Sequence, residues 1–380
     1  MPLTLAPVPV TSAADLHAQA MEAGLAFEHE RCVELAQQAL RADPERASAR
    51  VTLATALGYL QEHEEQGRQL EEALRQSPYM PAAHWNYALW LLLHGRYGEG
   101  WDHYRWGFAA GQRKIRTLAP EFEGGPYGER PNGGFPFLWS EQGFGDTIQF
   151  LRFVALLNEA HIPFRTTLEV TEPLARLVAG FPGADDVVIR PSDGGMPKHT
   201  YHCSLVSLPY FLGVNSPEQV PSAPYLWQDA QVERKRDRLT VGLAWQGSKS
   251  NTLDRQRSIP PFLLRQLVAT PGVDFVSLQV DQEPPSGVME LGRELKDFAD
   301  TAAALLSMDL LITVDTAVAH LAGALGVPTW VLLPATPDWR WLLEREDSPW
   351  YETARLFRQK VRGDWGEVIG RVTAELERYG

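Results

Sequence analysis

Residues Leu310 to Leu333 read LLITVDTAVAHLAGALGVPTWVLL, and this stretch is the strongest indicator of the fold. Two short apolar runs, Leu310–Val314 and Thr329–Leu333, have the length of buried strands. The segment between them, Thr316–Leu325, has the length and composition of a short helix. A strand, a helix and a second strand in this order predict a βαβ unit of a parallel sheet.

The junction between the first of these strands and the helix is a candidate anion site. Thr316, Ala317 and Val318 would offer backbone N–H groups at the start of the helix, and the small residues there would let a diphosphate come close. His320 lies about one turn further along and would add a donor to the same anion. A buried structural histidine is the other interpretation of His320.

Strands and helices alternate over most of the remaining chain, in two groups. The predicted strands are Phe135–Ser140, Phe164–Val170, Asp185–Arg190 and Tyr201–Val206, and later Val241–Trp245 and Val273–Val280. The predicted helices are Asp146–Asn158, Glu172–Ala179, Pro261–Leu267, Asp300–Ser307 and Trp365–Glu377. A linker rich in Gly and Pro, Gly124–Gly134, and a second break, Asn215–Arg238, set the two groups apart. Two α/β halves with a cleft between them are expected, and parallel sheets bind ligands at the carboxyl ends of their strands.

The first third of the chain has an internal repeat. The tripeptide Ala-Leu-Arg at 39–41 precedes Pro44, and its copy at 73–75 precedes Pro78, which gives a period of 34 residues. A third unit starts near Pro81. These units resemble tetratricopeptide repeats, which bury their apolar faces by stacking on their neighbours. The resemblance implies a concave surface for a peptide or protein; a spacer or a dimerisation module is the alternative.

A glycine-rich loop follows the first predicted strand. Gly143 and Gly145 allow tight backbone approach to a ligand, and Asp146 would lie near the carboxyl end of the strand, facing the cleft. A carboxylate at this place could take a proton from an attacking hydroxyl group. In the alternative interpretation, Asp146 and Gln149 form a capping box that satisfies the N–H groups at the start of the helix.

The polar loop from Trp245 to Pro260 follows the first strand of the second half. It contains Ser248, Lys249 and Arg257, and arginine suits phosphate because its planar guanidinium donates two parallel hydrogen bonds. A solvated loop is the alternative. Two anion-directed loops in one half and a candidate base in the other fit transfer from a sugar nucleotide. The leaving diphosphate needs N–H donors and positive charge, and the acceptor needs a base.

Composition restricts the class of protein. The 380 residues carry a net charge of −13, and 44% are hydrophobic, which excludes a wholly disordered chain and argues against a general nucleic-acid binder. Cys32 and Cys203 are too few for a disulfide framework or a multi-cysteine zinc site and are predicted to be small buried residues. Met1–Ser12 lacks a basic region, and no apolar run approaches the roughly 20 residues of a membrane span. A cytoplasmic protein without a signal peptide is expected.

From about Phe135 to Glu377 the chain resembles glycosyltransferase family 9, the heptosyltransferase-like enzymes of the GT-B fold. The strongest match, Asp315–Pro328, is similar to the donor-site segment of that family. The loop Gly143–Asp146 is similar to the family's first loop, whose Asp is assigned as general base. Arg257, three residues before Pro260, stands where the family has a lysine that contacts the donor phosphates.

Repeats joined to such a region also resemble the O-linked N-acetylglucosamine transferases. Closer still are bacterial proteins that join tetratricopeptide repeats to a family 9-like region, for which the block from Pro337 to Tyr351 is typical. These resemblances imply three parts: α-helical tetratricopeptide repeats (1–115), then a GT-B fold of two Rossmann-like halves, the acceptor half (116–232) and the donor half with a C-terminal helix (233–380).

The activity that the resemblance implies is that of an inverting glycosyltransferase of hexosyl- or heptosyltransferase type. It would move a sugar from a nucleoside-diphosphate sugar to a hydroxyl group of a protein, peptide or glycan acceptor, without a metal or other cofactor. Asp146 would be the catalytic base, next to the loop residues Gly143 and Gly145. The donor would be bound by Trp245, Gln246, Ser248, Arg257, Thr316, Ala317, Val318 and His320. A non-catalytic tetratricopeptide scaffold with a degenerate nucleotide-binding region is the alternative.

Overall fold

The computed structural model describes residues 11–121, 136–159, 165–226, 238–248 and 254–379. The chain forms two compact units: residues up to Leu92 together with Asp102–Gln112, and Leu93–Trp101 together with the chain from Arg113 onward. The predicted linker Gly124–Gly134, the predicted boundary between residues 232 and 233, and Lys249 lie outside the described residues.

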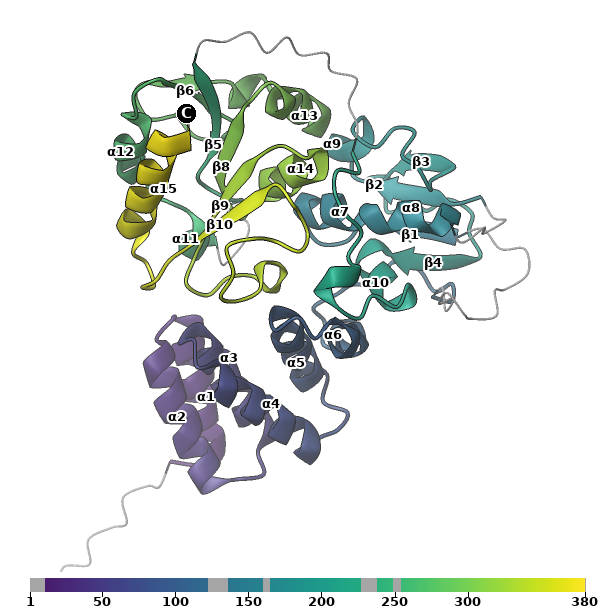
Figure 1. Ribbon diagram of the computed structural model, residues 1–380. Coiled ribbons are helices and arrows are strands. Elements are labelled where there is room, and N and C mark those ends of the chain that lie inside the picture. The colour runs from purple at the N-terminus through teal and green to yellow at the C-terminus, as the bar shows by residue number, and fades with distance from the viewer. Residues whose placement is uncertain (1–10, 122–135, 160–164, 227–237, 249–253, 380) are drawn as a thin grey trace, which may run out of the picture. The chain divides into compact units, whose positions relative to one another are not determined.

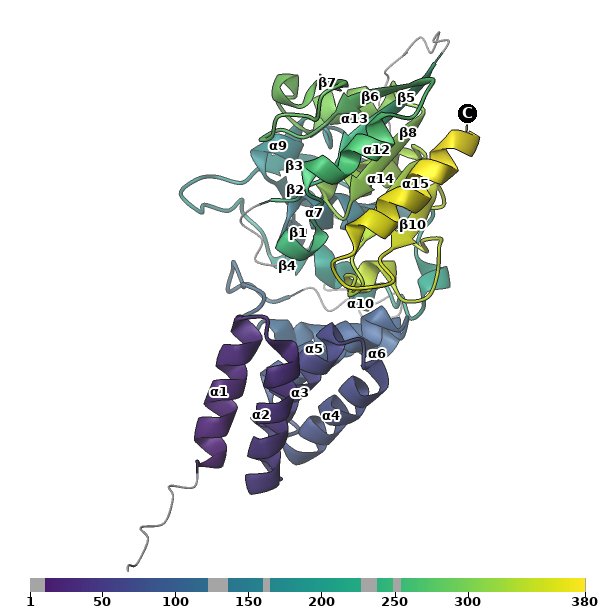
Figure 2. The ribbon, with the colours of Figure 1, turned by 90° about the vertical axis from the view of Figure 1, so that its left-hand side faces the viewer.

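The first unit is a helical repeat. Its helices are α1 (Ala13–Leu25), α2 (His29–Ala42), α3 (Ala47–Tyr59), α4 (His63–Gln76), α5 (Pro81–Leu93) and the end of α6 (Tyr97–Tyr104). Both the odd-numbered and the even-numbered helices start 34 residues apart, which confirms the predicted period. Figure 2 shows α1 to α4 side by side, and fully buried alanines such as Ala20, Ala36 and Ala54 let these helices approach closely. Cys32 is buried, as predicted.

The second unit contains two parallel sheets, and the first has the strand order β3-β2-β1-β4. Its strands are β1 (Pro136–Trp139), β2 (Thr167–Val170), β3 (Asp186–Ile189) and β4 (Tyr201–Ser204). Its helices are α7 (Phe144–Phe150), α8 (Arg152–Glu159), α9 (Glu172–Ala175) and α10 (Leu208–Phe211). The single helix predicted for Asp146–Asn158 is wrong: it starts at Phe144 and is divided at Leu151, where the Val154 N–H donates to the Leu151 carbonyl oxygen at 2.9 Å.

The second sheet has the order β10-β9-β8-β5-β6-β7, which is the strand order of a Rossmann fold. Its strands are β5 (Leu239–Ala244), β6 (Val273–Ser277), β7 (Val288–Glu290), β8 (Leu310–Val314), β9 (Thr329–Leu333) and β10 (Ala354–Arg358). Its helices are α11 (Asp254–Arg257), α12 (Arg265–Val268), α13 (Phe298–Leu306), α14 (Ala317–Leu325) and α15 (Trp365–Tyr379). The prediction of helical repeats followed by two parallel α/β halves is confirmed.

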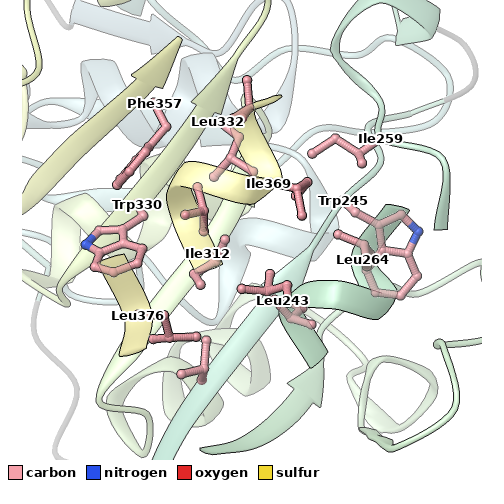
Figure 3. Close-up of a cluster of buried hydrophobic side chains, with 14 of the residues drawn as sticks. Leu243, Trp245, Ile259, Leu264, Ile312, Trp330, Leu332, Phe357, Ile369 and Leu376 are labelled. Atoms are coloured by element: carbon pink, nitrogen blue, oxygen red, sulfur yellow. The ribbon is translucent and has the colours of Figure 1, made fainter. Parts of the chain in front are cut away.

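Helices cover both faces of the second sheet (Figure 1): α12 and α15 pack together on one face, and α13 and α14 on the other. The core between the sheet and the α12–α15 layer contains Trp245, Ile259 and Leu264, which Figure 3 shows next to one another. Among the helices that the structure describes, none combines the length and the apolar character that crossing a bilayer requires.

Candidate functional site

The two sheets place three predicted loops at the points where their strand order reverses. In the second sheet, β5 and β8 are neighbours, although the chain runs from β5 to β6 on one side and from β8 to β9 on the other. The crevice at such a point is where open parallel sheets bind ligands. The loop after β5 begins at Trp245, and the loop after β8 is Asp315–Thr316. In the first sheet, β1 lies at the corresponding point, and the loop after it leads into Gly143–Asp146 at the start of α7.

Helix α14 presents its N-terminus at this crevice. Thr316 is its N-cap, in an extended conformation with φ −143° and ψ 170°, and its side chain makes no capping hydrogen bond. The first N–H groups of the helix are therefore not taken up by the cap. Thr316, Ala317 and Val318 are partly exposed, whereas the helix from Ala319 onward is almost entirely buried. An anion could reach α14 at this first turn.

His320 lies one turn into α14 and is buried. Its Nδ1 lies 2.9 Å from the hydroxyl group of Tyr351, and its Nε2 lies 3.8 Å from Oδ1 of Asp315. Its ring stacks on Trp341, with ring centroids 5.5 Å apart. Burial, followed by the charge of Arg340, lowers the pKa of His320 well below its usual value, so the imidazole is neutral near pH 7. It can serve the site as a hydrogen-bond donor, but not as a cation.

Asp146 lies in the first turn of α7. Its Oδ2 accepts the N–H of Gly143, the N-cap residue, at 2.7 Å, and its Oδ1 pairs with the guanidinium of Arg340. Burial raises the pKa of Asp146, while Arg340 and the Gly143 N–H act in the opposite direction. The predicted capping box of Asp146 with Gln149 is wrong. The helix starts two residues earlier than expected, so Asp146 caps it from the third helical position.

Arg340 connects the two halves around Asp146. It belongs to a 3₁₀ turn, Trp339–Trp341, that follows β9. Besides pairing with Asp146, its Nε donates to Oε1 of Gln149 at 2.6 Å, and its Nη1 donates to Oδ1 of Asp338 at 2.8 Å. The guanidinium also lies over the ring of Trp339, 4.3 Å from the ring centroid. This one side chain fixes the orientation of both Asp146 and Gln149.

Gly145, in the first turn of α7, directly contacts α14 of the second half. A methyl group on Gly145 would stand 2.7 Å from Cδ2 of His320 and 3.3 Å from Cα of Ala317, so only glycine permits this approach. Figure 1 shows α7 beside α14. The structure therefore brings Asp146 and the first turn of α14 to one place, as the cleft hypothesis requires.

The loop after β5 borders the same place through Arg257. The Nε of Arg257 lies 3.3 Å from Oδ1 of Asp254, a buried carboxylate that also accepts the hydroxyl hydrogen of Ser258 at 2.9 Å. Burial and Asp338 raise the pKa of Asp315 to about 6, and Arg257 and Arg340 oppose that rise. The two arginines thus lie within electrostatic reach of Asp315.

The three remaining predicted donor residues are placed differently from one another. Ser248 is exposed and Gln246 is partly exposed, with the Gln246 N–H donating to Oε1 of Gln279 at 3.1 Å. Trp245 is 2% exposed, and its indole belongs to the hydrophobic core (Figure 3). The Ile259 N–H donates to the Trp245 carbonyl oxygen at 2.8 Å and holds the backbone there. The Trp245 side chain therefore packs beneath the loop and does not line the crevice.

A buried ion-pair network supports the loop that carries Asp146. Glu141 accepts the hydrogen bonds of the Arg113 guanidinium, with its Nε at 3.0 Å, and of the Ser204 hydroxyl group. On the next strand, the buried Glu169 pairs with Arg116 and Arg190. The Glu141 contacts hold the segment between β1 and Gly143 in place, because Glu141 lies within that segment.

Sequence reasoning assigned no role to Arg340, Tyr351 or Asp338, and it gave Gln149 only a capping role. The available signal was the block from Pro337 to Tyr351, in which a single arginine stands between two tryptophans. The pattern was recognised as typical of a group of proteins, but not as part of the site. Within the described residues, no group of three or more His, Cys, Asp or Glu side chains is arranged to hold a metal ion.

Comparisons with known proteins give one curated relative and several solved structures. No protein-family model matches the chain. Protein FlbA of Caulobacter vibrioides is 29% identical over 330 residues, which cover 76% of this chain and 54% of that protein. The chain thus spans about half the length of the curated relative that it matches.

Two solved structures are similar to nearly two thirds of this chain. The ADP-heptose lipopolysaccharide heptosyltransferase II of E. coli is 14% identical, with 64% of this chain and 97% of that chain covered and a TM-score of 0.44. The glycosyl transferase family 9 protein of Veillonella parvula is also 14% identical, with 64% and 98% covered and a TM-score of 0.43. These values describe a likeness and assign no activity to this chain.

Proposed function

We propose that this protein is an inverting, metal-independent glycosyltransferase that uses a nucleoside-diphosphate sugar. The observation that carries the proposal is the meeting of three loops at one crevice: the uncapped start of α14, the loop with Arg257, and the Gly145–Asp146 turn from the other half. A departing diphosphate and an acceptor hydroxyl group need opposite chemistry within a few ångströms, and this crevice offers both.

On the donor side, the N–H groups of Ala317 and Val318 and the guanidinium of Arg257 would bind the diphosphate, beside the N-cap Thr316. In the tautomer protonated at Nε2, His320 accepts the Tyr351 hydroxyl hydrogen at Nδ1, and its Nε2–H would be the donor to the diphosphate. As the bond between the anomeric carbon and the phosphate oxygen breaks, negative charge grows on the diphosphate. The helix N-terminus and Arg257 stabilise that charge.

On the acceptor side, Asp146 would accept the proton of the attacking hydroxyl group. The hydroxyl oxygen forms a bond to the anomeric carbon on the face opposite the diphosphate, which inverts the configuration, and its proton passes to the Asp146 carboxylate. Arg340 and the Gly143 N–H favour the ionised form of Asp146, the form that a base needs. We further propose a protein or peptide acceptor bound by the helical repeats, and a cytoplasmic location.

The first test is a thermal-shift screen of the full chain with ADP, UDP, GDP, dTDP and CMP sugars. A ligand that binds only the native state must raise the melting temperature at saturating concentration. Calorimetry with the best ligand should give affinities that Arg257→Ala and His320→Ala weaken by about tenfold each, since each removes one hydrogen-bonding partner of the diphosphate. Arg255→Ala, two residues from Arg257, is the matched control. Binding of no sugar nucleotide to the wild type would leave the non-catalytic scaffold as the function.

A further inference from the structure

The segment Leu93–Trp101 belongs to the second unit, although it looks like part of the third helical repeat in the sequence. It includes the first half of α6, with Tyr97 and Trp101. Both side chains are buried, at 0% and 2% exposure, which is unusual for aromatic residues at the end of a repeat array that offers its last helix to solvent. Their neighbours are residues around the candidate site.

Tyr97 and Trp101 contact the segments on either side of Arg340. The Trp350 indole N–H donates to the Tyr97 hydroxyl oxygen at 3.1 Å. The ring of Trp101 meets the ring of Trp339 edge to face, with centroids 5.5 Å apart and an interplanar angle of 87°. Trp339 and Trp350 also contact each other, with centroids 5.9 Å apart. Pairs of this geometry are directional, so they fix ring positions as well as bury area.

Two short paths lead from Trp101 to Asp146. On the first, Trp101 supports Trp339, whose ring lies 4.3 Å below the Arg340 guanidinium, and Arg340 pairs with Asp146. On the second, Trp101 lies edge to face against Phe150 at 6.2 Å, and Phe150 ends the helix that begins next to Asp146. Trp101 therefore supports both partners of the Arg340–Asp146 ion pair.

We propose that Tyr97 and Trp101 are positioning residues of the transfer site. They hold the Arg340 guanidinium on the Asp146 carboxylate and thereby keep the base ionised, although neither of them touches a substrate. This inference rests on the proposed function in taking Asp146 as the base. It adds that α6, the last helix of the repeat array, supports the catalytic site through Tyr97 and Trp101.

The test uses Tyr97→Phe, which removes only the hydroxyl acceptor of Trp350, and Trp101→Leu, which removes the ring contacts. Arg340 lowers the pKa of Asp146, so a loosened Arg340 lets that pKa rise. The acid limb of kcat against pH should then move upward by about one unit in Trp101→Leu and by less in Tyr97→Phe. The rate loss should be about tenfold on the acid limb and vanish on the plateau at higher pH, with donor affinity unchanged.

Trp85→Leu is the matched control, because Trp85 packs on Tyr104 within the first unit. It should leave the pH profile as in the wild type. A rate loss in Trp101→Leu that is the same at every pH would mean a general packing role and overturn the proposal. So would an unchanged profile in a folded variant.

A second measurement separates this inference from the proposed function. Trp101→Leu and Asp146→Asn are combined, and the melting temperatures of the single and double variants are compared. If Trp101 acts through Arg340, the double variant should lose several degrees less than the two single shifts added together. Trp85→Leu with Asp146→Asn should be additive. Additivity for Trp101 as well overturns the positioning role, even where the wild type transfers no sugar and the proposed function has failed.

Discussion

The two carboxylate oxygens of Asp146 bind different partners. One carboxylate oxygen caps α7 through the Gly143 N–H, and the other pairs with Arg340. Each oxygen keeps a second lone pair, so these contacts still permit a proton to be accepted. The sequence presented capping and catalysis as alternatives, and the geometry makes them compatible.

Asp146→Asn should abolish transfer and leave donor affinity within a fewfold of the wild type, because the amide caps α7 but cannot accept the proton. The free energy of unfolding should fall by about 1–3 kcal/mol, since the buried Arg340 loses one charged partner. Transfer assays, calorimetry and urea unfolding measure the three quantities. Asp338→Asn removes another carboxylate from Arg340 and should retain transfer. Full activity of Asp146→Asn would take Asp146 out of the base role.

Asp315 should make donor binding depend on pH. Its pKa is raised to about 6, chiefly by burial, and it faces the carboxylate of Asp338, the guanidinia of Arg257 and Arg340, and the neutral His320. An ionised Asp315 repels a diphosphate, so the affinity for a sugar nucleotide should rise as pH falls through about 6. Calorimetry between about pH 5 and pH 8 measures this, and a sugar nucleotide is the suitable probe because its diphosphate does not titrate there.

In Asp315→Asn the affinity should be nearly constant over that range, and a persisting pH dependence would contradict the assignment. The same shift acts on stability. The folded state binds the Asp315 proton more readily than the unfolded state, whose pKa is near 3.8. The contribution of this group to the free energy of unfolding is therefore fully present below about pH 4 and is lost as pH rises to about 6.

Among the strands of the second sheet, the central ones could be predicted and the two edge strands could not. Strands β8 and β9 have the predicted bounds, since both are apolar runs in the middle of the second sheet. The edge strands β7 and β10 were not predicted. β7 has three residues, and β10 carries Arg355 and Arg358, so neither has an apolar pattern. Edge strands need fewer apolar residues because they have one neighbour and face solvent.

The site residues that lie after predicted strands could be predicted, and those that lie in an irregular turn could not. Thr316–Val318 and Asp146 lie at or just beyond the loops that follow predicted strands, so topology alone places them at the crevice. Arg340 lies in a 3₁₀ turn, and its partner Asp146 is 194 residues away in the chain. No local pattern encodes a contact of that separation, and Trp245, at the end of a strand, gave no sign that its ring turns inward.

The close approach of α7 to α14 gives a prediction at the scale of elements. Gly145→Ala would place a methyl group 2.7 Å from Cδ2 of His320, so the two helices must move apart. The free energy of unfolding should fall by about 1–3 kcal/mol, and donor affinity should weaken because the first turn of α14 shifts. Denaturant unfolding and calorimetry check both effects.

Gly370→Ala is the matched control, because a methyl group on Gly370 in α15 meets open space. In that helix the change should leave donor binding intact and stabilise the protein by up to about 1 kcal/mol. Wild-type stability and binding in Gly145→Ala would mean that the two helices do not need this contact.

In the whole second unit, an exposed ion-pair cluster joins the two halves away from the crevice. Arg176, after α9, pairs with Asp297 at 2.7 Å and with Asp300, both at the start of α13. Arg176 is 58% exposed, so salt screens the cluster. Arg176→Ala should lower the free energy of unfolding by less than about 1 kcal/mol, and only at low salt, as urea unfolding at two ionic strengths would measure. A larger fall in the free energy of unfolding, or one that does not depend on salt, would contradict this prediction.

The repeat period and the two α/β halves were predictable, but the membership of α6 was not. Tyr97 and Trp101 stand at positions where a helical repeat also places packing residues, so their pattern is the same in either unit. Only the three-dimensional neighbours of these side chains decide the question, and those neighbours come from segments more than 200 residues further along, such as Trp350.

This shared helix restricts how the chain can be divided. A cut at residue 115, where the sequence suggests a boundary, would remove Tyr97 and Trp101. The rings of Trp339 and Trp350 would then be exposed to water. A fragment meant to carry out the chemistry alone has to begin before Leu93. For the same reason, the helices α1–α4 could be exchanged for other repeats without loss of these contacts, while Leu93–Trp101 has to stay with the second unit.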